Sequence, residues 1–253
     1  MKKILKIILF IIQGVLVFIV YGALTTASVK NIEKIILVEQ FKNKAVYQEQ
    51  LSTNTLKFYK VESNEQMPAF IKQNGEIYPG NIGDILVSVE ASVLNPLVSN
   101  FVSFFAGGHA GLCVGEYKDN DIVVLDNNTI ETSALDNTGD YCQVYTKDYW
   151  INKSIYKEVI GLRCDITYDQ KMEVNSLACA YIEDPYNFTF LFDTINKSYC
   201  SDLISKIYKK VGINLNKDGF TTSIYDIIVS SDSYISYYHY YDNDGVRHIY
   251  YLG

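Results

Sequence analysis

The sequence predicts an α+β fold in which an antiparallel sheet and its packed helices are segregated along the chain. Residues 82–89 and 107–126 are β-prone runs broken by turn residues, which is typical of strands. Residues 168–182 and 201–211 carry apolar side chains at helical spacing. Separate runs of strands and helices favour α+β architecture.

The composition is that of a folded domain. The chain has 253 residues, of which 48% are hydrophobic and 20% charged. This supports one sizeable domain with a packed core. A net charge of −7 and the lack of a basic cluster argue against a nucleic-acid partner.

The N-terminus predicts a membrane-targeting segment. Lys2, Lys3 and Lys6 precede an apolar run over residues 7–24. Its length favours a transmembrane anchor, although small residues at 23–28 also suit signal-peptide cleavage. We therefore expect residues 1–27 to be a signal anchor or signal peptide. Lysines before the run place the rest of the chain on the extracellular face, or secreted if the segment is cleaved.

Two further regions follow. Residues 28–74 show partial helical spacing and no turn dipeptide before Asn74-Gly75, which suggests a helical stalk or extension. Residues 75–253 form the predicted catalytic domain. Its tyrosine-rich segment, residues 234–251, favours strands, with a wet cleft or partner surface as the alternative.

Two helices can be bounded from their signals. The helix over residues 168–182 should stop at Asp184-Pro185, because proline cannot continue it. The helix over residues 201–211 is followed by Gly212 at a C-cap position.

Cys200 is the candidate nucleophile. It lies at the start of the second helix, where the helix dipole and unpaired backbone N–H groups favour a thiolate. The other four cysteines, at positions 113, 142, 164 and 179, lie in strand or mid-helix settings, and disulfides among them stay open. No pair has zinc-ligand spacing, so we expect no metal site and no cofactor.

His109 is the candidate base. Gly107, Gly108 and Gly111 surround it, so another element could approach closely. A structural histidine is the alternative, and that reading is favoured for His239 and His248.

A hairpin predicts a third group. With a turn at residues 118–121, paired positions sum to about 239, which puts Asp126 opposite Cys113 and Asn128 opposite Gly111 on the His109 face. Either could orient the imidazole, and a register slip would substitute Asn127.

These motifs together resemble a known family. Gly83-Asp84-Ile85-Leu86, Gly108-His109-Ala110-Gly111-Leu112, Val124-Leu125-Asp126 and Tyr199-Cys200-Ser201-Asp202-Leu203-Ile204 occur in order, with Asp184-Pro185-Tyr186-Asn187-Phe188 upstream of the cysteine. Over residues 75–240 this is similar to the permuted NlpC-like cysteine peptidases and amidases, the YiiX/YaeF-like proteins. That family more often has Glu where Asp126 stands.

The resemblance implies a circularly permuted papain-like fold with Cys200 as nucleophile, His109 as base and Asp126 as orienting carboxylate. Backbone N–H groups near Cys200 would bind the oxyanion, with Tyr199 or Tyr186 as further donors. We expect hydrolysis of an amide, such as a cell-wall peptide bond, through an acyl-enzyme. The alternatives are a lipid or thioester acyl hydrolase or acyltransferase, and a non-catalytic surface binding domain.

Overall fold

The computed structural model describes residues 2–89, 108–118, 121–133, 139–189, 196–217 and 221–253. The strands are β1 (Val46–Tyr47), β2 (Leu56–Val61), β3 (Phe70–Gln73), β4 (Glu76–Pro79), β5 (Ile85–Ser88), β6 (His109–Lys118), β7 (Asp121–Thr132), β8 (Cys142–Thr146), β9 (Glu158–Cys164), β10 (Ser233–Tyr241) and β11 (Arg247–Leu252). The helices are α1 (Lys2–Asn43), the short 3-10 helix η1 (Glu49–Leu51), α3 (Asp148–Ile151), α4 (Tyr168–Cys179), α5 (Cys200–Lys210) and α6 (Ile224–Ile228).

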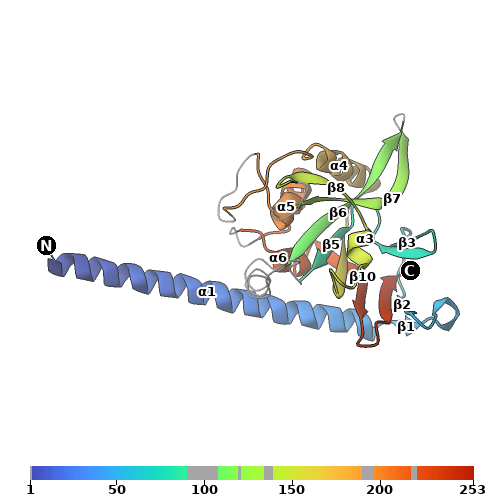
Figure 1. The fold of residues 1–253 in the computed structure, drawn as a ribbon, viewed down its shortest axis with the longest axis horizontal. Coiled ribbons are helices and arrows are strands. Elements are labelled where there is room, and N and C mark those ends of the chain that lie inside the picture. Colours follow the sequence, from blue (N-terminus) through green and yellow to red (C-terminus); the bar gives the residue numbers. More distant parts are fainter. Residues whose placement is uncertain (1, 90–107, 119–120, 134–138, 190–195, 218–220) are drawn as a thin grey trace.

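Most strands join one sheet, in the order β1-β2-β11-β10-β9-β5-β6-β7-β8 (Figure 1). Every neighbouring pair in it is antiparallel except β11 and β2. The hairpin β3–β4 forms a separate two-stranded sheet. The predicted mixture of helices with a mainly antiparallel sheet is confirmed.

The two faces of the sheet bury different partners. Ala110 and Leu112 on β6 join the main core, which also contains residues of α1, α4, α5 and α6. Cys113 points the other way and packs in a smaller cluster with Trp150 of α3. This follows from the alternation of side chains along a strand. The helices that bury the main core therefore cover one face, while α3 lies on the other.

In residues 28–74, predicted as a helical stalk or extension, α1 ends at Asn43 and strands follow. Helix α1 continues to Asn43, and its C-terminal part packs on the domain through the buried side chains of Val38 and Phe41. After it, β2 pairs in parallel with β11 and extends the main sheet. The apolar residues at partial helical spacing lie in α1, which ends at Asn43. The pairing of β2 with β11 joins segments far apart in the sequence, so it left no local signal. The main sheet therefore includes residues before position 75.

The N-terminal part of α1 extends away from the sheet (Figure 1). Within the described part of the chain, no helix combines the length and apolarity needed to cross a membrane. The predicted transmembrane helix is thus not supported.

The tyrosine-rich tail forms β10 and β11, as the strand reading predicted. Tyr237 packs with Phe58 in a second small cluster, separate from that of Cys113 and Trp150. Tyr238 instead points into the main core. The tyrosines of this tail supply packing area on both faces of the sheet.

The two predicted helices are present. A capping box between Thr167 and Gln170 starts α4, which ends at Cys179, before the predicted stop at Asp184-Pro185. Helix α5 begins at Cys200, one residue earlier than predicted. Gly212 follows its end with φ of 89°, the left-handed conformation expected there.

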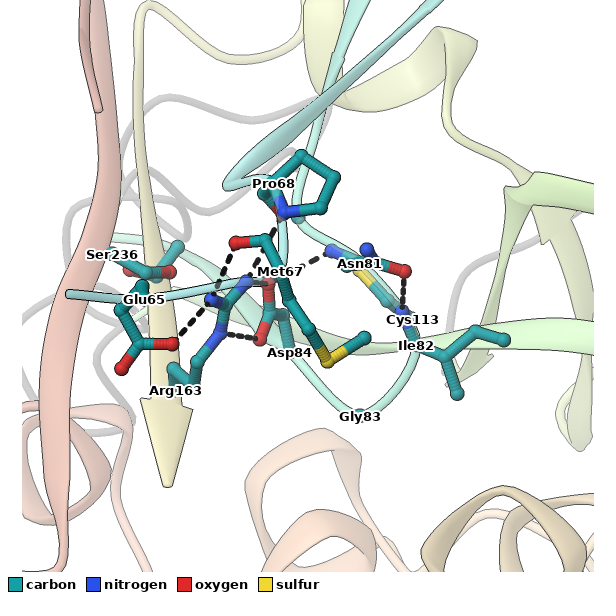
Figure 2. Close-up of polar contacts among 12 residues, drawn as sticks. Glu65, Met67, Pro68, Asn81, Ile82, Gly83, Asp84, Cys113, Arg163 and Ser236 are labelled. Carbon is teal, nitrogen blue, oxygen red and sulfur yellow. Dashed lines mark hydrogen bonds and ion pairs between the residues drawn. The ribbon is translucent and has the colours of Figure 1, made fainter. Parts of the chain in front are cut away.

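A buried ion pair holds the turn before β5 (Figure 2). Arg163 donates from Nε and Nη2 to the two oxygens of Asp84, at 2.7 Å each. The same guanidinium also donates to Glu65 and to the carbonyl groups of Met67 and Pro68. This network joins β9, the segment before β3 and the turn into β5.

That turn is connected to β6 and α5. The backbone N–H of Gly83 donates to the Cys113 carbonyl, and the Cys113 N–H donates to the Asp84 carbonyl. The Tyr208 hydroxyl, on α5, donates to the Gly83 carbonyl. One turn therefore contacts both elements that carry the candidate base and nucleophile.

Candidate active site

The β6–β7 hairpin has two registers. Near the turn, Tyr117 pairs with Ile122, as the predicted sum of 239 requires. A bulge between Val114 and Glu116 then places three extra residues in β7, so that Cys113 pairs with Thr129 instead of Asp126. The predicted register is wrong beyond this bulge. Because three is an odd number, the shift also exchanges the faces on which the β7 side chains lie.

Glu131 occupies the position predicted for Asp126. Its Oε2 lies 2.7 Å from Nε2 of His109, and the side chains are 6% and 17% exposed. A carboxylate can only accept a hydrogen bond, so Nε2 carries the proton and Nδ1 remains for another partner. This is the orientation that a third member of a catalytic triad imposes.

The second oxygen of Glu131 is also bound. Trp150 Nε1 donates to Oε1 at 2.7 Å, and the Thr129 hydroxyl donates to the same atom. Three donors therefore converge on one buried carboxylate.

Two aromatic rings stack against the candidate base. The Trp150 ring lies 5.7 Å from that of His109 with planes 15° apart, and Tyr156 lies 6.4 Å away at 10°. Trp150 and Tyr156 also stack on each other at 4.9 Å. These rings form one wall of the site and restrict rotation of the imidazole.

Cys200 is the first residue of α5, and Tyr199 is the N-cap. The first N–H groups of a helix lack intrahelical acceptors, so they are available to an anion beside Cys200. The Cys200 thiol lies 4.0 Å from the carbonyl of Gly108, the residue before His109, and Cys200 is among the groups that raise the pKa of His109. The start of α5 and the start of β6 therefore meet at this point.

The surroundings of His109 favour its charged form. Burial by itself lowers the pKa of His109, because it penalises the imidazolium. Hydrogen bonds to Cys200 and Glu131, together with the negative charge of these groups, outweigh burial and raise the pKa to about 10. The imidazolium is therefore the main form at neutral pH.

Other segments pack closely against the glycines beside His109, as the sequence predicted. Gly108 has φ of +93°, and a Cβ there would lie 1.9 Å from the Ser88 carbonyl oxygen. A Cβ on Gly111 would lie 2.9 Å from Cγ of Glu131 and 3.0 Å from Cζ2 of Trp150. Position 108 therefore requires glycine, and a side chain at Gly111 would displace Glu131 or Trp150. Gly107 lies outside the described residues.

Tyr186 and Tyr199 lie near the thiol. Tyr186 forms an isolated bridge with Ser198, two residues before Cys200, and both phenols are buried. Burial raises the pKa of Tyr186 and of Tyr199, and the negative charge of Cys200 contributes to each increase. Both phenols thus keep their protons and can donate.

The remaining thiols form no disulfide in the structure. Burial raises the pKa of Cys113, Cys142 and Cys164 to about 12. Cys113 lies on the His109 face, as parity predicted, in the cluster that contains Trp150 and Tyr156, and its thiol lies 3.9 Å from the Pro79 carbonyl. Cys179 is the most exposed of the five.

The other two histidines lie in structural settings. His239 is fully buried and bonded to Tyr237, and burial holds its pKa well below the usual value. His248 contacts Asp242 and stacks on Tyr240.

One predicted residue, Asn128, is not brought to the site. Asn128 pairs with Val114 and alternates with Thr129 and Glu131, so it lies on the opposite face of β7. The side chain of Asp126, like that of Asn127, lies outside the described part of the chain. One signal could have identified Glu131, because the resembling family more often has Glu at this position. The role of Trp150 had no local signal, since α3 reaches the site only through the tertiary fold.

Comparison with known proteins identifies the family of this chain. No curated protein matches the chain. Among solved structures, one described as "Crystal structure of metalloprotein yiiX from Escherichia coli O157:H7" is similar, with 16% identity and a TM-score of 0.41. The match covers 58% of this chain and 77% of that one. A family model described as "Permuted papain-like amidase enzyme, YaeF/YiiX, C92 family" matches residues 81–234, which is more than half of the chain and contains Cys200, His109 and Glu131. The chain therefore belongs to the permuted papain-like amidase family.

Proposed function

We propose that the protein is a cysteine amidase with Cys200 as nucleophile, His109 as general acid and base, and Glu131 as the orienting carboxylate. The observation that carries this proposal is the buried Glu131 carboxylate 2.7 Å from His109, with the Cys200 thiol 4.0 Å from the carbonyl of the preceding residue, Gly108. Glu131 takes the role that the sequence assigned to Asp126.

The arrangement supports an acyl-enzyme mechanism. His109 holds the Cys200 proton on Nδ1 as an imidazolium, and the thiolate attacks the amide carbonyl. The N–H groups at the start of α5 bind the resulting oxyanion, with Tyr186 or Tyr199 as additional donors. His109 then passes its proton to the leaving amine. It next removes a proton from the water that hydrolyses the thioester and returns that proton to Cys200.

Alkylation of Cys200 tests the nucleophile. The wild-type protein and His109→Ala are treated with iodoacetamide at neutral pH, and each modified cysteine is quantified by peptide mass spectrometry. Cys200 should react faster than Cys179 in the wild type, although Cys200 is the more buried thiol. In His109→Ala its rate should fall at least about 10-fold, while Cys179 is unchanged.

Equal Cys200 labelling rates in the two proteins would show that His109 does not activate the thiol, and the amidase proposal would fail. Under the alternative of a non-catalytic binding domain, Cys200→Ser would bind ligand as the wild type does, and no substrate would be turned over.

A substrate panel addresses the scissile bond. We propose a peptide amide, and cell-wall peptide follows from the exported location expected from the sequence. Purified muropeptides are incubated beside a lipid ester and an acyl thioester, with Cys200→Ser as the blank. Release of a new amine from muropeptides supports the proposal. Turnover of the lipid ester or thioester alone would favour the acyl hydrolase alternative.

A further inference from the structure

Trp150 is the only tryptophan of the chain, and it contacts both His109 and Glu131. We propose that Trp150 is a positioning residue: its indole N–H fixes the Glu131 carboxylate, and its ring fixes the plane of the imidazole. This inference rests on the proposed function, because it concerns how His109 is directed at Cys200.

The first part of the argument concerns the carboxylate. Oε1 of Glu131 accepts from Trp150 and Thr129, which leaves Oε2 for His109. Exchanging the two oxygens by rotation requires the buried indole N–H to lose its acceptor during the movement, and an unmet buried donor is strongly unfavourable. The two donors thus select one carboxylate orientation.

The second part concerns the ring. Trp150 is fully buried, and its indole is nearly parallel to the imidazole. Turning His109 about its side-chain torsions would break this stack and the bond to Glu131 together. A cation over an indole face is also stabilised. The ring therefore favours the charged, correctly oriented imidazole.

The third part concerns rigidity. Helix α3 is short, but its neighbourhood is anchored. Asp148 accepts from the Tyr78 hydroxyl of β4 at 3.0 Å, and the buried Lys147 ammonium donates to the Gly80 carbonyl. Trp150 is held between these anchors and Tyr156. A positioning group must itself be held rigidly, and these contacts hold Trp150 in place.

The main test uses Trp150→Phe, which retains an aromatic ring and removes the N–H. The matched control is Tyr149→Phe, because Tyr149 lies on the same helix and is half exposed. Steady-state kinetics on the amide substrate should show kcat lowered about 10- to 100-fold in Trp150→Phe, with KM changed less than about twofold. Tyr149→Phe should match the wild type.

The pH dependence of Cys200 alkylation distinguishes a positioning role from a general loss of folding. The pH of half-maximal alkylation should rise by about one unit in Trp150→Phe, because a less ordered imidazole takes the thiol proton less readily. If Trp150→Phe folds poorly, Thr129→Val removes the other donor from Oε1 and should shift the same profile in the same direction.

Fluorescence of the single tryptophan gives an independent check. The wild-type emission should show a transition centred at about pH 10 as His109 loses its proton, and His109→Ala should lack this transition. Wild-type kcat and an unchanged alkylation profile in folded Trp150→Phe would overturn the positioning role while leaving the amidase intact. Loss of the His109 dependence of alkylation would instead overturn the proposed function.

Discussion

Replacing Glu131 with glutamine should disable the site while preserving its shape. Three donors point at the carboxylate, from His109, Trp150 and Thr129. Glutamine offers one acceptor oxygen and one NH₂ group in the same space. If its oxygen stays with Trp150 and Thr129, the NH₂ group faces Nε2 of His109. The imidazole must then move its proton to Nδ1, the nitrogen that has to accept from Cys200.

The magnitude follows from this wrong tautomer. In serine proteases, the corresponding Asp-to-Asn change lowers kcat by about 10⁴-fold. We expect kcat/KM of Glu131→Gln to fall about 10³- to 10⁴-fold, which corresponds to about 4–5.5 kcal/mol of lost transition-state stabilisation.

Amide hydrolysis and iodoacetamide labelling of Cys200 are the assays, with Asp126→Asn as the matched control. Asp126→Asn should stay within about twofold of the wild type, because Glu131 already supplies the carboxylate at the imidazole. Activity above one tenth of the wild type in Glu131→Gln, or an equal loss in Asp126→Asn, would refute the reasoning.

Three further predictions concern the surroundings of the site. Gly111→Ala places a methyl group 2.9 Å from Cγ of Glu131, so the protein should remain folded by circular dichroism but lose about 10-fold or more in kcat. Arg163→Met leaves Asp84 buried without its partner and should lower the free energy of unfolding in urea by about 3–5 kcal/mol, whereas the more exposed Lys60→Met should change it by less than about 0.5 kcal/mol. The pKa of His109 is raised to about 10, so its stabilising contribution is complete below about pH 6.5 and is lost as the pH rises through 10. The stability difference between wild type and His109→Ala should therefore shrink over that range in urea titrations, and a constant difference would contradict the raised pKa.

Local patterns were enough to predict the elements that carry the proposed base and nucleophile. A run of apolar residues at helical spacing after Cys200 predicted α5, and the glycines around His109 indicated a close approach. Both signals are local, because helix initiation and backbone crowding depend on residues adjacent in sequence. The hairpin of β6 and β7 was predictable for the same reason.

The third member of the site was not predictable from local pattern. The register near the turn was correct, but the bulge moved the pairing by three residues. Nothing in the residues around the turn specifies how many residues a bulge inserts, because the bulge depends on the packing of the whole sheet. The pairing of β2 with β11 escaped prediction because these strands lie at opposite ends of the chain.

By itself, the sequence determined the fold class, the helix that begins at Cys200 and the glycine-flanked His109, because each depends on neighbours along the chain. Only the tertiary structure decided that Glu131 contacts His109 and that Trp150 binds both. Those contacts join β6, β7 and α3, and they exist only after the bulged register and the packing of α3 are set.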